Sequence, residues 1–160
     1  MRILVVSDTH GSEELLQQAI GAQPQAAAVI HLGDGAREAQ ILADKFPDIP
    51  FYQVRGNCDW GLPTDALPVS RLERMGGKRV FCTHGHTYDV KYGLYRATMA
   101  ARENRADVLL YGHTHQAFTA YDDGLHILNP GSLSRGGRPS YGLLDITSRG
   151  ILPHVVEVDW

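Results

Sequence analysis

The sequence predicts an α/β protein built on a parallel β-sheet. Three short apolar runs, 2–7, 26–32 and 51–54, have the composition of strands that are buried on both faces of a sheet. Two segments with helical character, 13–20 and 36–46, separate these runs. A strand–helix–strand–helix–strand order favours parallel strands that are joined by right-handed crossovers.

Both helical segments have one apolar face. The residues that recur with helical spacing are Leu15, Leu16, Ala19 and Ile20 in the first segment and Ala39, Leu42, Ala43 and Phe46 in the second. Ser12 is the predicted N-cap of the first helix, because acidic residues follow it in the first turn. Pro47 ends the second helix.

The rest of the chain predicts a hairpin, a third helix and several short strands. Gly76-Gly77 joins an alternating segment, 66–74, to the apolar run 78–83, which is typical of a β-hairpin. The pattern over 90–104 predicts a helix. Tyr88, Tyr92 and Tyr95 have the spacing of one helical face, where core packing is expected, the alternative being a pocket or subunit contact that they line together with Trp60. The remaining predicted strands are 107–111, 117–122, 125–128, 140–146 and 151–158.

Length and composition indicate one globular domain over residues 1–160. Charged residues make up 21% of the chain and the net charge is −3, so nothing points to nucleic acid as an obligate partner. We find no apolar run of the roughly 20 residues that a membrane helix needs, and no export signal. Two cysteines, Cys58 and Cys82, are too few for a disulfide framework, so we expect a cytoplasmic protein. A homo-oligomer is left open.

Polar side chains gather directly after the predicted strands. Seven potential metal ligands stand there, each within three residues of a glycine: Asp8, His10, Asp34, Asn57, His84, His113 and His115. The carboxyl ends of parallel strands converge on one crevice, so we expect these residues to meet although they are far apart in sequence.

This set of residues has the chemistry of a site for two metal ions. Imidazole and carboxylate ligands suit Mn, Fe, Ni, Co or Zn, with no thiolate set for a structural zinc site. Seven ligands are too many for one tetrahedral ion. They suit two ions about 3.5–4 Å apart that share a bridging carboxylate.

The motifs strongly resemble those of the calcineurin-like metallophosphoesterases. That family's pattern is D-x-H, G-D, G-N-H-[DE], G-H and G-H-x-H. It stands here as Asp8-Thr9-His10, Gly33-Asp34, Gly56-Asn57-Cys58-Asp59, His84-Gly85-His86 and Gly112-His113-Thr114-His115. The short chain, the GNCD sequence and Asn129-Pro130-Gly131-Ser132 resemble the small single-domain YfcE-type phosphodiesterases. The resemblance implies a four-layer αββα sandwich, with two mixed β-sheets flanked by helices.

The resemblance also implies which residues hold each ion. Asp8, His10, Asp34 and His115 would hold the first ion, and Asp34, Asn57, His84 and His113 the second, with Asp34 bridging. Such a centre, Mn²⁺ being the first choice of metal, carries a net charge of about +1 with a bridging hydroxide and attracts phosphate esters. We expect a small phosphodiester as substrate, hydrolysed by direct attack of that hydroxide without a side-chain nucleophile.

One position departs from the family pattern. Cys58 stands where the broader family has a histidine that acts as general acid or contacts the phosphoryl group, and a thiol is a poor proton donor to an alkoxide. We therefore expect activated aryl diesters to be the better substrates. His86 is the candidate replacement as acid or phosphate contact, with a purely structural role as the alternative.

Several assignments around the site stay open. Cys58, His86 and Arg55 are the predicted substrate-binding residues, and Asn57, Cys58 and His86 the predicted catalytic ones. Asp59 either orients a neighbouring group or caps the turn, and His31 is expected to be a packed histidine behind the site. The competing functions are a phosphomonoesterase and a non-catalytic protein-interaction scaffold, a use of this fold in the retromer coat.

Overall fold

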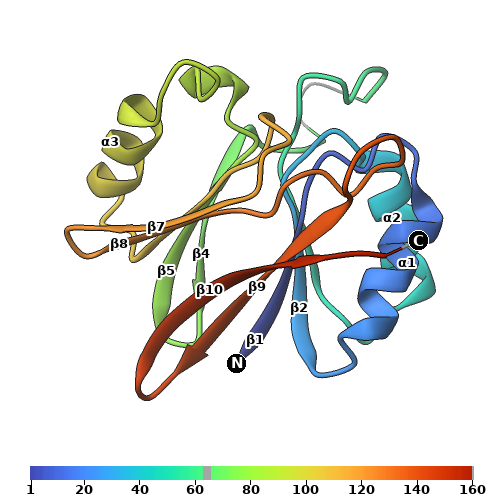
Figure 1. Cartoon of the computed structure of the whole chain (residues 1–160), viewed down its shortest axis with the longest axis horizontal. Helices are drawn as coiled ribbons and strands as arrows, with labels where there is room; N and C mark the ends of the chain where they lie inside the picture. The colour runs from blue at the N-terminus through green and yellow to red at the C-terminus, as the bar shows by residue number, and fades with distance from the viewer. Residues whose placement is uncertain (63–65, 160) are drawn as a thin grey trace.

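The computed structural model describes residues 1–62 and 66–159, and Trp160, the last residue of the predicted domain, lies outside the described residues. Two five-stranded sheets stand face to face in the middle of the molecule (Figure 1). Helices α1 (Glu13–Ala22) and α2 (Ala36–Lys45) lie on one outer side, and α3 (Tyr95–Glu103) lies on the other. Within the described residues, no helix is long and apolar enough to span a membrane.

The first sheet contains the predicted parallel strands. It comprises β1 (Arg2–Val6), β2 (Ala26–His31), β3 (Phe51–Gln53), β9 (Ser140–Thr147) and β10 (Gly150–Glu157). The spatial order is β10-β9-β1-β2-β3. β1, β2 and β3 run parallel, whereas β9 and β10 are antiparallel to their neighbours, so the sheet is mixed.

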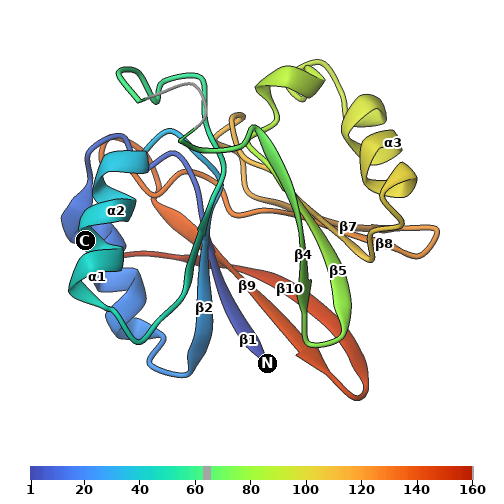
Figure 2. The ribbon, with the colours of Figure 1, turned by 180° about the vertical axis from the view of Figure 1, so that it is seen from behind.

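The second sheet is mixed as well. It comprises β4 (Ser70–Met75), β5 (Lys78–Thr83), β6 (Val108–Leu110), β7 (Phe118–Asp122) and β8 (Leu125–Asn129), in the order β4-β5-β6-β8-β7. β5, β6 and β8 are parallel, and the two edge strands are antiparallel to them. Figure 2 shows the predicted hairpin, β4–β5, beside the first sheet. Its first strand begins at Ser70 rather than at residue 66.

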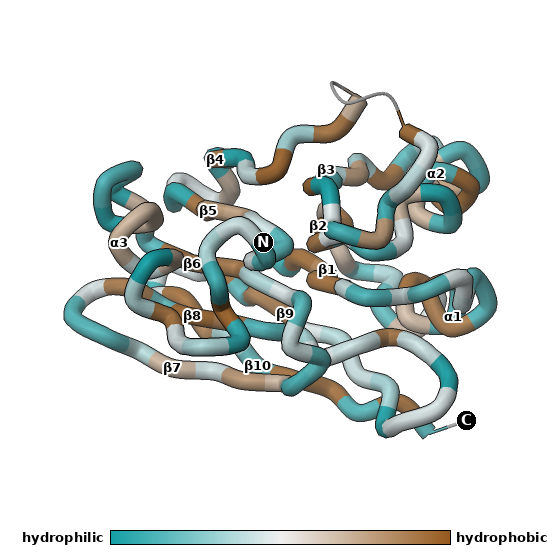
Figure 3. The backbone as a smooth tube through the Cα atoms, turned by 90° about the horizontal axis from the view of Figure 1, so that it is seen from above, coloured by the Kyte–Doolittle hydropathy of each residue, from teal (hydrophilic) through white to brown (hydrophobic). Residues whose placement is uncertain are grey.

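Alternation along β1 shows how the layers are held together. Ile3 and Val5 point into a core between the sheets, where they meet apolar residues of β5 and β6 such as Val80. Leu4 and Val6 point the other way and pack with α1 and α2. A third cluster joins α3 to the outer face of the second sheet. Figure 3 shows hydrophobic stretches of β1 and β6 toward the middle of the molecule. The four-layer αββα sandwich is thus confirmed.

The predicted helix over 90–104 is wrong at its start. A short 3-10 turn, His86–Tyr88, comes first, and α3 begins only at Tyr95, because Gly93 adopts a φ of 147° that a helix cannot contain. The three tyrosines therefore share no core-facing side. Tyr88 packs against the third cluster, as predicted, whereas Tyr92 and Tyr95 are 94% and 77% exposed, so the predicted core packing is wrong for these two.

Ser12 is the N-cap residue of α1, as predicted, but it does not cap the helix through its side chain. The Ser12 side chain makes no capping hydrogen bond to the helix. Its hydroxyl oxygen instead accepts a hydrogen bond from the main-chain N–H of Arg135, at 3.4 Å. A tertiary contact with the 132–138 loop takes the place of the local cap.

Candidate metal centre

The structure brings all seven predicted ligands to one edge of the molecule. Asp8 and His10 follow β1, Asp34 follows β2 and Asn57 follows β3, while His84 follows β5 and His113 and His115 follow β6. Donor atoms of Asp8, His10 and His115 lie within 4.8 Å of one another, and so do those of Asp34, His84 and His113. The crevice lies between the ends of two sheets, not along one open sheet.

Asp8 is completely buried and has one oxygen in need of a partner. Oδ2 accepts hydrogen bonds from the Ser7 hydroxyl at 2.5 Å and from the His113 main-chain N–H at 3.0 Å. Oδ1 has no hydrogen-bond partner among the described residues. Three imidazole Nε2 atoms nevertheless surround it, those of His115, His10 and His84, at 3.1, 3.8 and 3.9 Å.

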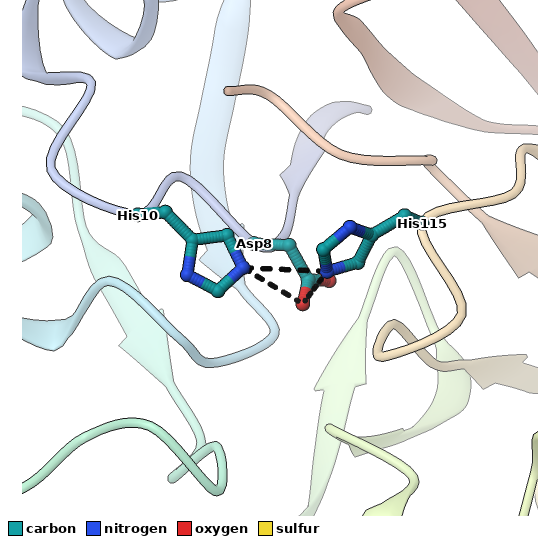
Figure 4. Close-up of side chains that lie close together, drawn as sticks. All are labelled: Asp8, His10 and His115. Carbon is teal, nitrogen blue, oxygen red and sulfur yellow. Dashed lines mark hydrogen bonds and ion pairs between the residues drawn. The ribbon is translucent and has the colours of Figure 1, made fainter. Parts of the chain in front are cut away.

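This arrangement fits a metal ion better than it fits a hydrogen-bond network (Figure 4). The Nε2 atoms of His10 and His115 face each other at 3.3 Å, with the Asp8 carboxylate between the rings. Ligand atoms that each lie about 2.0–2.2 Å from a common ion end up roughly 3–4 Å apart. A buried carboxylate oxygen without a hydrogen bond is costly, and a cation at this point would satisfy it.

The second cluster is built around His84, which is also completely buried. Its Nδ1 lies 2.7 Å from the Leu32 carbonyl, and a carbonyl can only accept, so Nδ1 carries the hydrogen. In the neutral ring, Nε2 therefore presents a lone pair to its surroundings. Asn57 Oδ1, His113 Nδ1 and Asp34 Oδ2 lie 3.0, 3.2 and 3.4 Å from it.

Asp34 lies between the two clusters. Its Oδ2 approaches His84, and its donor atoms also lie within 4.8 Å of those of His10 and Cys58. The main-chain N–H of Cys58 donates to Asp34 Oδ1 at 2.7 Å. Gly56 makes this close approach possible, because a Cβ at that position would collide with Asp34 Oδ1. The carboxylate therefore belongs to two groups of potential ligand atoms, one with His84 and His113 and one with His10 and Cys58.

The main chain is strained at most of these positions. Five of the predicted ligands have a left-handed backbone, with φ between 44° and 68°: Asp8, His10, Asp34, His113 and His115. Such conformations are uncommon for residues other than glycine and cluster at functional sites. The glycine-containing loops and the packed sheets hold these turns in place.

Asp59 has both of the roles that the sequence left open. Its carboxylate accepts from the main-chain N–H groups of Asp34 at 3.0 Å and Gly56 at 2.7 Å, so it ties two metal loops together. It also accepts from Gly35 and Ala36, each at 2.9 Å, at the start of α2. One carboxylate thus caps a helix and fixes the Asp34 main chain.

Glu38 supports the site although it belongs to no motif. This residue on α2 is buried, and it accepts hydrogen bonds from the Thr9 hydroxyl at 2.7 Å and the Gly11 N–H at 2.6 Å. His31 Nε2 lies 3.0 Å from the same hydroxyl, and His31 Nδ1 accepts from Gly33. The residues on both sides of His10 are therefore anchored. His31 is a packed histidine behind the site, as expected.

The pKa values of three of the imidazoles are shifted, and not all in the same direction. Burial acts to lower the pKa of His84, but the Asp34 and Asp8 carboxylates outweigh it and raise that pKa. Contact with the Asp8 carboxylate raises the pKa of His115. Burial, together with repulsion from His84 and Lys91, lowers the pKa of His113 to about 4. Burial would raise the pKa values of Asp8 and Asp34, yet their imidazole neighbours bring both below the usual range.

The predicted substrate-binding residues lie around the second cluster. The His86 ring centroid is 5.3 Å from that of His84, and its buried Nδ1 has no hydrogen-bond partner among the described residues. Burial and repulsion from His84 and Arg55 lower the pKa of His86. Cys58 is exposed, and its sulfur accepts from the Asn57 side-chain amide at 3.3 Å. Partial desolvation beside the neighbouring loops and the Asp34 carboxylate raise the pKa of its thiol.

Two grooves open from the metal centre, and His10 and Gly11 line both. The larger, of about 930 Å³, runs between the start of α1 and the 132–138 loop, which carries Arg135 and Arg138. The smaller, of about 240 Å³, lies on the other side, with Asp34, Cys58 and Trp60 among its lining residues.

Comparison with known proteins identifies the family. A family model described as a calcineurin-like phosphoesterase superfamily domain matches residues 1–149. The probable metallophosphoesterase YsnB of Bacillus subtilis is 36% identical over 135 residues, covering 83% of this chain and 75% of the relative. Phosphodiesterase YfcE of Escherichia coli K12 is 32% identical over 168 residues, covering 91% of this chain and 88% of the relative.

Solved structures show the same fold. A predicted phosphoesterase from Streptococcus pneumoniae superposes with a TM-score of 0.82 at 26% identity, covering 98% of this chain and 88% of the other. Vps29 from Chaetomium thermophilum superposes with a TM-score of 0.77 at 20% identity, covering 99% and 92%, which is a likeness of fold alone. The chain belongs to the calcineurin-like phosphoesterase superfamily and has the phosphodiesterase YfcE among its relatives.

Proposed function

We propose that the protein is a phosphodiesterase that depends on two divalent metal ions. The observation that carries this proposal is the buried Asp8 Oδ1, which has three imidazole nitrogens around it and no hydrogen-bond partner among the described residues. A protein-interaction scaffold gains nothing from such an arrangement, because a buried carboxylate oxygen without a hydrogen bond costs stability.

Two groups of side chains would hold the ions. Asp34 belongs to both, with Asp8, His10 and His115 on one side and Asn57, His84 and His113 on the other. When bound, the two ions supply a water-derived nucleophile at neutral pH and positive charge for the phosphoryl oxygens. Mn²⁺ is the proposed metal, since mixed imidazole, carboxylate and carboxamide ligands suit it, and Ni²⁺, Fe²⁺, Zn²⁺ and Co²⁺ suit the set as well.

The chain's own residues would bind and orient the phosphate group. The His86 ring stands beside the second cluster, at 5.3 Å from the His84 ring and 6.1 Å from the His113 ring, and is proposed to donate to a phosphoryl oxygen together with the Arg55 guanidinium. Cys58 contributes through its main chain, because its N–H fixes Asp34 Oδ1. Its sulfur orients the Asn57 amide so that Oδ1 faces His84 Nε2.

A diester fits the surroundings better than a monoester does. Each of the two ester arms of a diester needs a path away from the centre, and the two grooves provide one on either side. A monoester would leave one groove unused. The proposed substrate is therefore a small phosphodiester, without nucleic acid or membrane as an obligate partner. The proposed location is the cytoplasm, where both free cysteines would stay reduced.

The test is turnover of bis-p-nitrophenyl phosphate against p-nitrophenyl phosphate. The protein is stripped with a chelator and reloaded with Mn²⁺ or Ni²⁺. Metal-dependent turnover of the diester in preference to the monoester supports the proposal, and Asp34→Ala should abolish it. Asp48→Ala, at an exposed aspartate outside the site, is the matched control. Preference for the monoester would favour a phosphatase, and no turnover of either with metal bound would favour a scaffold.

A further inference from the structure

Trp60 is a large apolar side chain that is exposed to solvent beside the candidate metal centre. Its side chain is 84% exposed and lines the smaller groove. Trp60 directly follows Asp59, whose carboxylate is tied to the Asp34 and Gly56 loops, and its own N–H donates to the Cys58 carbonyl at 2.9 Å. The base of the side chain is therefore fixed to the metal loops while its ring faces solvent.

The smaller groove has the size and lining of a site for one aromatic ring. Its volume of about 240 Å³ is below the roughly 300–1,000 Å³ of pockets that hold a whole small ligand. Charged side chains line this groove as well, Asp34, Glu38 and Asp59 among them, and Leu62 and Ala36 add apolar surface. Arg37, which is exposed, gives the same groove a planar cation. Indole and guanidinium planes both favour stacking against a flat ring.

The larger groove has a different character. Serines, glycines and charged side chains line it, and the Arg135 guanidinium forms an ion pair with Glu14 across it. Ser132 ties its wall to the site by donating to the Asp8 carbonyl at 2.8 Å. No aromatic side chain other than the two imidazoles of the centre lines it. Both grooves start at His10 and Gly11, but only the smaller one is lined by a tryptophan.

From this asymmetry we infer that the natural substrate is a diester with one planar aromatic arm, such as an aryl group or a nucleobase, which stacks on Trp60 in the smaller groove. The second arm, polar and flexible, lies in the larger groove. This inference rests on the proposed phosphodiesterase function and adds the class of substrate. Trp60 is then a specificity-determining residue that acts on binding of one arm.

The experiment measures binding, without turnover, by calorimetric titration of the Mn²⁺-loaded protein. The probes are diphenyl phosphate and diethyl phosphate, which carry the same charge and differ in the aromatic rings. Trp60→Ala should weaken binding of diphenyl phosphate about tenfold, as expected for loss of one stacked ring, and leave diethyl phosphate unchanged. Trp60→Phe should retain most of the affinity for diphenyl phosphate.

Tyr92→Ala is the matched control, because Tyr92 is even more exposed but lies in neither groove, and it should change neither affinity. Equal weakening of both probes by Trp60→Ala, or no weakening at all, would overturn the inference. Such a result would leave metal-dependent turnover of bis-p-nitrophenyl phosphate untouched. Failure of the substrate assignment is therefore distinct from failure of the proposed function.

Discussion

The carboxylate of Asp59 accepts a hydrogen bond from the main-chain N–H of Asp34 at 3.0 Å. Through this bond, and three more to neighbouring N–H groups, a residue that touches no predicted ion fixes the residue that would bridge both. Supporting contacts of this kind commonly change metal affinity by about 10–100-fold when they are lost.

Replacing Asp59 should therefore affect both folding and metal binding. We expect Asp59→Ala to lower the free energy of unfolding by about 3 kcal/mol, because four N–H groups lose a buried charged acceptor. Mn²⁺ affinity should fall by about 10–100-fold. Asp59→Asn keeps one oxygen acceptor, so its free energy of unfolding and its Mn²⁺ affinity should lie between those of the wild type and Asp59→Ala. Urea unfolding and Mn²⁺ titration measure the two effects, with Asp48→Ala as control. Wild-type affinity in Asp59→Ala would refute the role of this clamp.

Gly56→Ala tests the close approach of the main chain to Asp34. The added methyl group would collide with Asp34 Oδ1 and push the carboxylate away from its place between the clusters. We expect at least about a tenfold loss of Mn²⁺ affinity. Gly21→Ala, where a Cβ meets nothing within 4 Å, is the control and should bind Mn²⁺ normally. Should both variants bind alike, the steric account of Gly56 is wrong.

Glu38 provides a test of the network behind His10. Glu38→Ala removes the acceptor of the Thr9 hydroxyl and the Gly11 N–H, so the loop that carries His10 should loosen. We expect Mn²⁺ affinity to drop by about 10–100-fold, with Glu38→Gln largely restoring it because its carbonyl oxygen still accepts. If Gln and Ala are equally defective, the charge of Glu38 matters rather than its hydrogen bonds.

Metal affinity should fall on acidification through the neutral range. A protonated imidazole cannot bind a metal, and the raised pKa values of His84 and His115 mean that both keep a proton to a higher pH than an ordinary histidine of pKa 6.5. His113, with a pKa of about 4, competes only in far more acidic solution. Calorimetric Mn²⁺ titration at pH 8 and pH 6 should show weaker binding and more proton release at pH 6. Equal affinities at the two pH values would contradict this.

Cys58→Ser should retain most of the diester turnover. The contact with Asp34 comes from the main-chain N–H and survives substitution, and a serine oxygen can still accept from the Asn57 amide. Cys58→Ala removes that acceptor and should be the weaker of the two variants. A loss on the order of a thousandfold or more in Cys58→Ser would instead identify the thiol as a nucleophile.

The strands and the gathering of the ligands followed from sequence because apolar runs and strand-end motifs are local signals. The second sheet could not be predicted from the strand pattern, because the sequences of β5 and β6 are equally compatible with one larger sheet. Only the packing of Ile3 against Val80 shows that two sheets face each other. The supporting role of Glu38 could not be predicted, because no sequence motif marks a buried acidic residue on a helix. The left-handed backbone of Asp8 and His113 is imposed by tertiary contacts, which a one-dimensional pattern does not contain.

The most direct test of the central claim counts the ions that Asp34 is placed to bridge. Equilibrium dialysis with Mn²⁺, followed by elemental analysis and electron paramagnetic resonance, gives both the number of ions per chain and their magnetic coupling. We predict two ions per chain with a coupled signal in the wild type, and loss of the coupled signal in Asp34→Ala. A fully active protein that binds a single uncoupled ion would contradict the account.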